Sequence, residues 1–419
     1  MKPQAVKGTH DVLPDEQPLW RHLLGAVERE LTRAGARQLT TPVFEYSEIF
    51  EKSVGDSADL VVQKEMYTFE DRGGRSLTLR PEFTAAVLRA FIEHGMHTRP
   101  SPVKLWSAGP LFRAENVQRG RYRQFHQVNL EIIGLSQALA DAEAVQLLYR
   151  TLQASGLRRH HIRLGSVGDP EDRAAYNAYL RDRLAPRAEE LSETSRRRLE
   201  LNPMRVLDSK SEQDQQLIAD LKRPLDFLGE GAREHLDEVR RYLDAWDVPY
   251  EMDPAIVRGL DYYRRTAFEV HFEGIGAQSA LGGGGRYDGL IESLGGPPLP
   301  GVGWALGIER VFDALAQEGV VPADRDRPVL FLVPLDEEAV LEMTALAIRL
   351  RERFRVEHAY QPRNPGKGLK EADRSGAVFA ALRGSSERAQ NVVQLKHLAS
   401  GDQVAVAESD LESHLQERL

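Results

Sequence analysis

Residues 112–134 carry a dense set of side chains that could bind a charged ligand. The segment begins with Arg113 and Glu115 and continues into a basic, glycine-containing run. Beyond that run, residues alternate with a period of two, which predicts a strand. Four side chains of this strand share one face: Phe125, Gln127, Asn129 and Glu131. A hairpin with a basic loop could hold a polyanion beside a small polar ligand, although solvated arginines on an ordinary hairpin are the alternative.

Three further stretches carry residue types suited to ligand binding: TLRPEFT at 78–84, RGLDYY at 258–263 with LGGGGRYDGL at 281–290, and GVGWALGIER at 301–310. Each of these stretches is weak evidence when it is taken alone. Four consecutive glycines usually mark a bend or a close approach of backbone, and this run lacks the GK[ST] ending of a P-loop. Their order along the chain therefore matters more than any single stretch.

Hydrophobic periodicity and turn residues predict the elements that position these stretches. Helices are expected at 15–35, 81–94, 141–156 (with Asp141 as its N-cap), 229–246 and from 308. Strands are expected at 37–41, 66–69, 76–79, 102–109, 250–252, 267–272 and 278–281, the last leading into the glycine run. Residues 169–224 are polar and predict a helical insertion. Many strands with helices on one side indicate an α+β domain with a mostly antiparallel sheet.

A second domain is expected beyond the linker-like segment 319–328. Strands and helices alternate there, with strands at 329–333, 356–360 and 378–382 and helices at 337–354 and 368–376. This alternation predicts a small α/β domain with parallel strand pairing. We therefore expect a first domain at 1–322, with its insertion at about 169–224, and a second domain at 327–419.

Composition excludes several kinds of site. The chain of 419 residues has no cysteine, which excludes disulfides, thiolate metal sites and cysteine nucleophiles. No cluster of His, Asp and Glu has the spacing of a protein metal site, so none is expected. The net charge of −9 argues against indiscriminate nucleic-acid binding but allows a specific RNA partner. Without a signal-peptide pattern or a run of about 18 apolar residues, a cytoplasmic protein that does not enter the membrane is expected.

In this order, the four stretches resemble the class II aminoacyl-tRNA synthetases, and most closely the histidyl-tRNA synthetase family. The hairpin, with Arg113, Glu115, RGRYRQFHQ and Glu131, resembles the second class-defining motif, and GVGWALGIER resembles the third. Residues 15–42 take the place of the first motif, which builds a dimer interface. RGLDYY and GGRYD resemble two peptides that distinguish histidyl enzymes. The final domain resembles the family's α/β anticodon-binding domain, and the first resembles its α+β catalytic domain with a class II sheet.

The resemblance implies a histidine–tRNA ligase that acts as a homodimer. Such an enzyme activates L-histidine with ATP to histidyl-adenylate and transfers histidine to the 3′ end of tRNA(His). Its catalysis depends on positioning and on stabilising charge. Magnesium is expected to accompany ATP, held largely by phosphates and water.

Roles are implied for the residues that match family positions. Arg113 and Arg258 would stabilise charge on the reacting phosphorus and also contact histidine. ATP would further contact Glu115, Phe125 and Arg310. Histidine would be recognised by Glu82, Thr84, Gln127, Glu131, Tyr262 and Tyr263, with Glu131 and Tyr263 on the imidazole and the glycine run close under the ligand. Partners for both ring nitrogens would reject analogues that lack them. The acceptor end of the tRNA would meet Arg119, Arg121 and Arg123.

Three departures and two alternatives accompany this interpretation. The expected helix at 368–376 is shorter than its counterpart in the family, which bears on contacts to the anticodon loop. Ala114, Asn116 and Val117 differ from the family's usual hairpin loop, and Phe83 stands where a glycine is common; its side chain is expected to point into the core. One alternative is the synthetase-like regulatory subunit of ATP phosphoribosyltransferase, which binds histidine as an effector and typically lacks the anticodon domain. The other is an RNA-binding protein without catalysis. The set Arg113, Arg258 and Arg310 favours the ligase.

Overall fold

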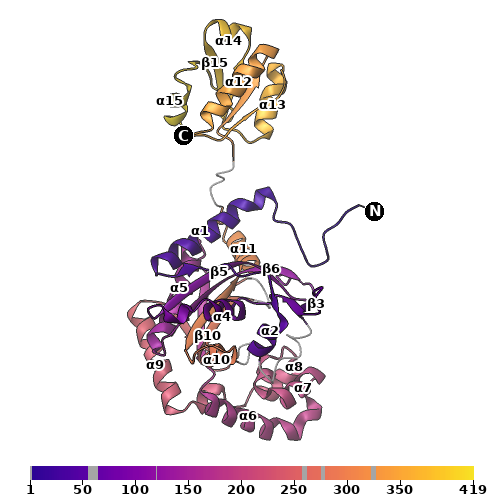
Figure 1. The fold of residues 1–419 in the computed structure, drawn as a ribbon, viewed down its shortest axis with the longest axis vertical. Coiled ribbons are helices and arrows are strands. Elements are labelled where there is room, and N and C mark those ends of the chain that lie inside the picture. Colours follow the sequence, from indigo (N-terminus) through magenta and orange to yellow (C-terminus); the bar gives the residue numbers. More distant parts are fainter. Residues whose placement is uncertain (1, 55–64, 119, 257–261, 275–278, 322–326) are drawn as a thin grey trace. The chain divides into compact units, whose positions relative to one another are not determined.

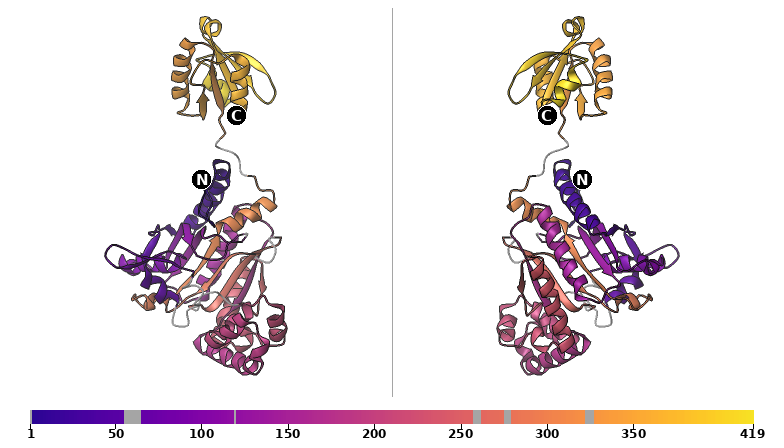
Figure 2. Two further views of the ribbon diagram at one scale, coloured as in Figure 1. Left: turned by 90° about the vertical axis from the view of Figure 1, so that its right-hand side faces the viewer. Right: turned by 90° about the vertical axis from the view of Figure 1, so that its left-hand side faces the viewer.

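The computed structural model describes residues 2–54, 65–118, 120–256, 262–274, 279–321 and 327–419. The chain forms two compact units, Met1–Val321 and Pro322–Leu419. Each unit has its own sheet and its own core (Figures 1 and 2).

The first unit is built on an eight-stranded sheet. In spatial order its strands are β1 (Arg37–Gln38), β5 (Val103–Phe112), β6 (Gln124–Ile133), β11 (Gly301–Gly307), β10 (Ala280–Arg286), β9 (Arg264–Phe272), β7 (His160–Ser166) and β8 (Tyr250–Met252). The two outer pairs, β1–β5 and β7–β8, are parallel, and the pairings between them are antiparallel. The predicted, mostly antiparallel sheet is confirmed.

Four helices share the main core with one face of this sheet: α1 (Gln17–Arg33), α5 (Ala138–Ala154), α9 (Glu230–Ala245) and α11 (Ile308–Gln317). Strand β6 contributes Val128, Leu130 and Ile132 to this core, and all three are fully buried. Because side chains alternate along a strand, the intervening residues of β6 project from the opposite face. The apolar pattern of β6 thus turns its polar residues away from the helices.

The β5–β6 hairpin is in register from Val103 opposite Ile133 to Phe112 opposite Gln124. A smaller sheet of β2 (Phe44–Tyr46), β4 (Ser76–Leu79) and β3 (Tyr67–Glu70) leads through Pro81 into α4 (Thr84–Glu93). The predicted hairpin at 66–79 is therefore present. Helices α2 (Ser47–Val54) and α10 (Leu290–Ser293) complete this side of the unit.

Several details of the prediction are wrong. The strand expected at 37–41 covers only Arg37–Gln38. The strand expected to end at 281 continues to Arg286, and the glycine run forms most of β10. A Cβ on Gly284 would lie 1.9 Å from the carbonyl oxygen of Gly303 in β11, so the neighbouring strand requires this glycine. Asp141 is not the cap of α5, which begins after Gln137. It is buried inside the helix, where its carboxylate pairs with Arg286 of β10.

The insertion consists of short helices with a core of their own. Its α-helices are α6 (Pro170–Leu184), α7 (Glu193–Leu201) and α8 (Glu212–Ile218), joined by 3₁₀ turns that include Pro203–Asp208 and Pro224–Phe227. The insertion core includes Ala267 of β9, and Tyr263 packs against it. The insertion is thus attached directly to the strand that follows RGLDYY.

The second unit contains a five-stranded sheet with the order β13 (Val356–His358), β12 (Leu330–Pro334), β14 (Phe379–Arg383), β15 (Val392–His397) and β16 (Gln403–Ala407). Its helices are α12 (Glu337–Leu350), α13 (Pro365–Arg374), α14 (Ser385–Ala389) and α15 (Leu411–Gln416). The first three strands are parallel, as predicted, and the last two are antiparallel additions. Within the described ranges, no helix combines the length and the apolar character needed to cross a membrane.

Candidate active site

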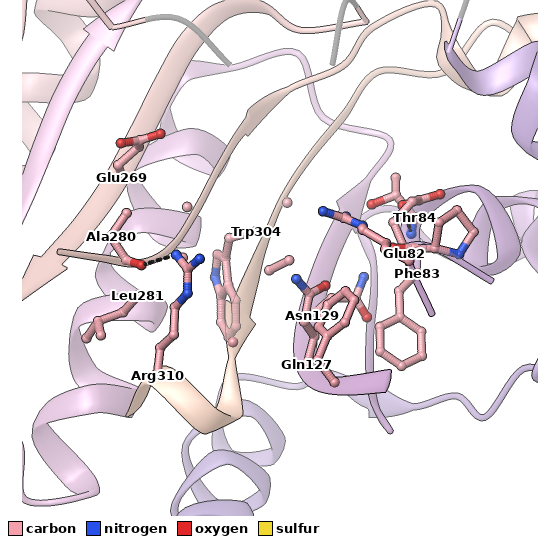
Figure 3. Close-up of a pocket in the computed structure, with 18 of the residues that line it drawn as sticks. Glu82, Phe83, Thr84, Gln127, Asn129, Glu269, Ala280, Leu281, Trp304 and Arg310 are labelled. Carbon is pink, nitrogen blue, oxygen red and sulfur yellow. Dashed lines mark hydrogen bonds between the residues drawn. The ribbon is translucent and has the colours of Figure 1, made fainter. Parts of the chain in front are cut away.

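A cavity of about 530 Å³ lies on the face of the sheet opposite the main core (Figure 3). The hairpin β5–β6, the strands β10 and β11 and the start of α4 supply most of its walls. Eleven sequence-predicted residues line it: Glu82, Thr84, Arg113, Glu115, Arg121, Phe125, Gln127, Glu131, Tyr262, Tyr263 and Arg310. Arg123 does not line this cavity. Arg119 and Arg258 lie outside the described residues.

Glu131 is the most deeply buried acid of the cavity, with 1% of its surface exposed. Its carboxylate accepts hydrogen bonds from Asn129 Nδ2 at 2.8 Å and from the Tyr287 hydroxyl at 2.6 Å. Burial raises the pKa of Glu131 to about 7, and the hydrogen bonds from its neighbours only partly offset that effect. Glu131 can therefore be either a proton donor or an acceptor near neutral pH.

A glycine in the adjacent strand makes room for this carboxylate. Gly303 of β11 pairs with Glu131 of β6. A Cβ on Gly303 would lie 2.1 Å from Glu131 Oε2. Any larger residue at Gly303 would therefore displace the Glu131 carboxylate on the neighbouring strand.

A second acid of the cavity, the half-buried Glu82, lies just before α4. Glu82 accepts backbone hydrogen bonds from Thr84 at 2.5 Å and Ala85 at 2.8 Å, which places its carboxylate at the helix N-terminus. Burial raises the pKa of Glu82, while these bonds act in the opposite direction. Phe83 is 2% exposed and packs in the core, with the Arg80 guanidinium 4.5 Å from its ring. As expected, Phe83 points away from Glu82 and Thr84 (Figure 3).

Three tyrosines surround this end of the cavity. The rings of Tyr262 and Tyr263 are 4.7 Å apart, and those of Tyr262 and Tyr287 are 6.1 Å apart. Burial raises the pKa of Tyr262 and of Tyr287 well above the usual value, so both hydroxyls keep their protons. Tyr287 was not assigned a role from the sequence, although it belongs to the GGRYD peptide. The buried pair of Arg286 and Asp141 fixes the backbone beside it.

Arg310 lies on the side of the cavity opposite Glu82 and Thr84, with Trp304 between them (Figure 3). Its guanidinium donates to the carbonyl of Gly120 at 3.1 Å and to that of Ala280 at 2.7 Å. Burial lowers the pKa of Arg310 from its very high ordinary value, and the nearby cations Arg121 and Arg113 contribute in the same direction. These cations form a positive region at this side of the cavity.

Arg113 connects the two sides of the cavity. Its Nε donates to the carbonyl of Pro81 at 3.0 Å, and its guanidinium lies 5.3 Å from the centre of the Phe125 ring. A base that stacks on Phe125 must therefore share this ring with Arg113 or use its other face. Glu115 pairs with Arg121 at 3.3 Å, which links the start of the hairpin loop to its basic part.

The acid next to Arg310 holds the hairpin in place. Glu309 accepts from the His126 backbone at 2.9 Å and contacts His126 Nδ1 at 2.8 Å. His126 also meets the Trp20 ring of α1 edge-on at 4.7 Å. Glu309 thus ties α11 to β6, which fixes the spacing between Arg310 and the polar face of the strand.

Two cavity residues come from the insertion, which sequence reasoning did not connect with the site. Arg198 of α7 and Arg205 of the following 3₁₀ turn line the cavity. Their region is rich in arginine and glutamate throughout, so nothing in the local pattern distinguishes these two arginines. Among the described residues, no group of three or more His, Cys, Asp or Glu side chains could hold a metal ion.

Models of known protein families match both units of the chain. The family model described as Histidyl-tRNA synthetase matches residues 8–311, and the one described as Anticodon binding domain matches residues 329–418. The chain is 57% identical to a histidine–tRNA ligase of Thermus thermophilus over the full length of both chains. It is 50% identical to that of Deinococcus radiodurans, covering 97% of this chain and 98% of the relative.

A solved structure extends the comparison to three dimensions. The apo histidyl-tRNA synthetase of S. aureus superposes with a TM-score of 0.83 at 34% identity, covering 99% of this chain and 100% of that one. The chain belongs to the histidyl-tRNA synthetase family.

Proposed function

We propose that this chain is a histidine–tRNA ligase whose cavity joins histidine to ATP and then passes the histidyl group to tRNA(His). One observation carries the assignment of the site. A buried carboxylate with polar partners, Glu131, and a group of cations around Arg310 and Arg113 share one cavity. The first suits an imidazole, and the second suits a triphosphate.

In this proposal, the histidine side chain lies between Glu131 and the tyrosines. An imidazole N–H donates to the Glu131 carboxylate, and the hydroxyl of Tyr263 serves the other ring nitrogen. Tyr262 and Tyr287 complete the wall, and Tyr287 keeps the carboxylate oriented through its hydrogen bond of 2.6 Å. The α-amino group of histidine meets Glu82, Thr84 and Gln127, which line the same cavity.

The reacting phosphate lies next to Arg113. The histidine carboxylate attacks the α-phosphorus, the bond to the β-phosphate oxygen breaks, and pyrophosphate leaves. Arg113 and Arg258 stabilise the charge on the phosphoryl oxygens, and Arg310 holds the γ-phosphate. The adenine stacks on Phe125 with Glu115 beside it. In the transfer step, a hydroxyl of the tRNA's terminal ribose attacks the histidyl carbonyl and AMP leaves.

Magnesium is proposed to enter with ATP. The carboxylates of Glu115 and Glu269 line the cavity and act electrostatically on Arg310. Oxygen donors of this kind, added to phosphates and water, fit the coordination of magnesium. When bound, the ion would neutralise phosphate charge, and Glu269 could add one contact to those from phosphates and water, since Glu115 is assigned to the adenine.

The tRNA is proposed to contact both units. Arg119, Arg121 and Arg123 in the hairpin loop would meet its acceptor end, and the unit that matches the anticodon-binding model would meet its anticodon. A homodimer in the cytoplasm is proposed from family membership and the residues at 15–42. The exposed apolar side chains of Phe44 and Phe69, whose rings are 6.5 Å apart, support a protein partner next to that segment.

The regulatory-subunit alternative has no specific observation in its favour. A structure titled as an ATP phosphoribosyltransferase regulatory subunit/histidyl-tRNA synthetase, from Bacillus halodurans, has a TM-score of 0.67 at 21% identity, which shows the fold alone. The cations at the phosphate side and the match of residues 329–418 both support the ligase.

Histidine-dependent exchange of labelled pyrophosphate into ATP tests the proposal. Exchange with histidine, but not with other amino acids, is the expected result. Folded protein that binds histidine without catalysing exchange would instead support the regulatory role.

A further inference from the structure

We propose that the N-terminal segment, residues 2–13, positions the basic loop of the active site through Gly8, an inference that rests on the proposed function. The basic loop is residues 117–123, of which residue 119 lies outside the described ones. The loop provides Gly120, Arg121 and Tyr122 to the cavity wall. In this role Gly8 is a positioning residue, because it acts on substrates only through the loop.

The backbone of Gly8 is bonded to the end of the loop where β6 begins. Its carbonyl oxygen accepts from the backbone N–H of Arg123 at 2.8 Å and from that of Gln124 at 3.2 Å. These bonds join positions more than a hundred residues apart. The N-terminal segment therefore fixes the point at which the loop becomes a strand.

The local geometry requires a glycine at this position. Thr9 N–H donates to the carbonyl of Val6 at 2.9 Å, so Gly8 is the third residue of a four-residue turn. It has a φ of +88°, which this position of a type II turn demands. A Cβ on Gly8 would lie 2.8 Å from Val117 Cγ2 and 2.8 Å from Arg123 Cγ, one at each end of the loop. The two ends meet on this glycine.

A second contact reaches the cavity wall itself. The ring of His10 lies 4.9 Å from the ring of Tyr122, tilted by 50°. Tyr122 lines the cavity, and His10 Nδ1 is buried in this contact. The N-terminal segment therefore touches a loop residue of the cavity wall as well as Val117 and Arg123.

On its cavity side, the loop is held by residues proposed to bind ATP. Arg310 Nε donates to the Gly120 carbonyl at 3.1 Å, and Arg121 pairs with Glu115 at 3.3 Å. The loop thus lies between the N-terminal segment and the phosphate side of the site. Displacing it would disturb the groups for ATP and tRNA. Glu131 and Gln127 would keep their places, because they belong to β6 and pair with β5 and β11.

Gly8→Ala tests this inference, with Gly295→Ala as the matched control. Gly295 also has a positive φ, +87°, but a Cβ there would meet nothing within 4 Å. Both substitutions strain a turn, and only the first pushes on the loop. We expect Gly8→Ala to raise the KM for ATP and for tRNA by about 10-fold, equivalent to about 1.4 kcal/mol. The KM for histidine should stay within about 2-fold in both variants.

The outcomes separate a positioning role from a loss of stability. Equal KM values for Gly8→Ala and Gly295→Ala would overturn the inference, as would a rise in the KM for histidine equal to that for ATP. If Gly8→Ala fails to unfold cooperatively, His10→Ala replaces it and should show the same selective rise. Wild-type protein without histidine-dependent exchange would overturn the proposed function itself. Active variants whose KM values for ATP and histidine rise equally would overturn only the role of Gly8.

Discussion

Replacing Glu131 by glutamine should make the protein more stable and a poorer enzyme. The pKa of this buried carboxyl is raised from 4.5 to about 7. The folded protein therefore holds the proton more tightly than the unfolded chain does. As the pH rises from about 4.5 to about 7, ionisation of Glu131 lowers the free energy of unfolding. Above pH 7 the loss is complete. With 1.36 kcal/mol per pKa unit, this loss is roughly 3 kcal/mol.

The amide of Glu131→Gln carries no charge and can still bond its neighbours. Its oxygen can accept from Asn129 Nδ2, and its nitrogen, in the place of Oε2, can donate to the hydroxyl oxygen of Tyr287. We therefore expect the stability gain over wild type to be roughly 2–3 kcal/mol larger at pH 8 than at pH 5. The imidazole would lose a charge-assisted hydrogen bond worth roughly 1.5–3 kcal/mol, so the KM for histidine should rise about 10- to 150-fold.

Urea unfolding at both pH values and pyrophosphate exchange at pH 8 measure the two effects. Glu234→Gln, on the exposed part of α9, is the control for the amide substitution and should leave the KM for histidine unchanged. A stability difference that does not grow with pH would refute the ionisation argument. An equal rise in the KM values for histidine and ATP would refute the imidazole assignment.

Three further substitutions test separate parts of the structure. Arg286→Met should cost about 3–5 kcal/mol in urea unfolding because it leaves Asp141 buried without its cation; a loss below about 1 kcal/mol would contradict this. Gly303→Ala should raise the KM for histidine about 10-fold or more by displacing Glu131, and an unchanged KM would count against the contact. Arg258→Ala should lower kcat by about 10²–10³ while histidine binding changes little; near-normal exchange would remove Arg258 from the chemistry.

The parts of the fold that depend on local pattern could be predicted from the sequence. The period of two in residues 124–133 correctly separates the core face of β6 from its polar face, because alternation is a property of the strand itself. The hairpin at 66–79 follows from turn residues between two strand patterns, and the α/β character of the second unit follows from the order of its strand and helix patterns.

The errors have long-range causes. Asp141 has the residue type of an N-cap, but its partner Arg286 lies 145 positions away. The glycine run has the composition of a loop, yet close contact with β11 makes it a strand. The antiparallel strands β15 and β16 complete a sheet whose parallel part alone was expected.

The candidate site shows the same division between local and distant information. Most of the lining residues belong to the family motifs, and they could be recognised from the sequence because each motif is contiguous. Tyr287 was missed because its role depends on a hydrogen bond to Glu131, 156 positions away. Arg198 and Arg205 reach the cavity only because the insertion packs on β9, and Gly8 meets the basic loop only through tertiary contact.

The structure of the protein with histidine bound tests the central claim most directly. We expect an imidazole nitrogen within about 2.7–3.2 Å of the Glu131 carboxylate, and the histidine carboxylate directed toward Arg113. An imidazole bound elsewhere in the cavity, with Glu131 contacting only Asn129 and Tyr287, would contradict it.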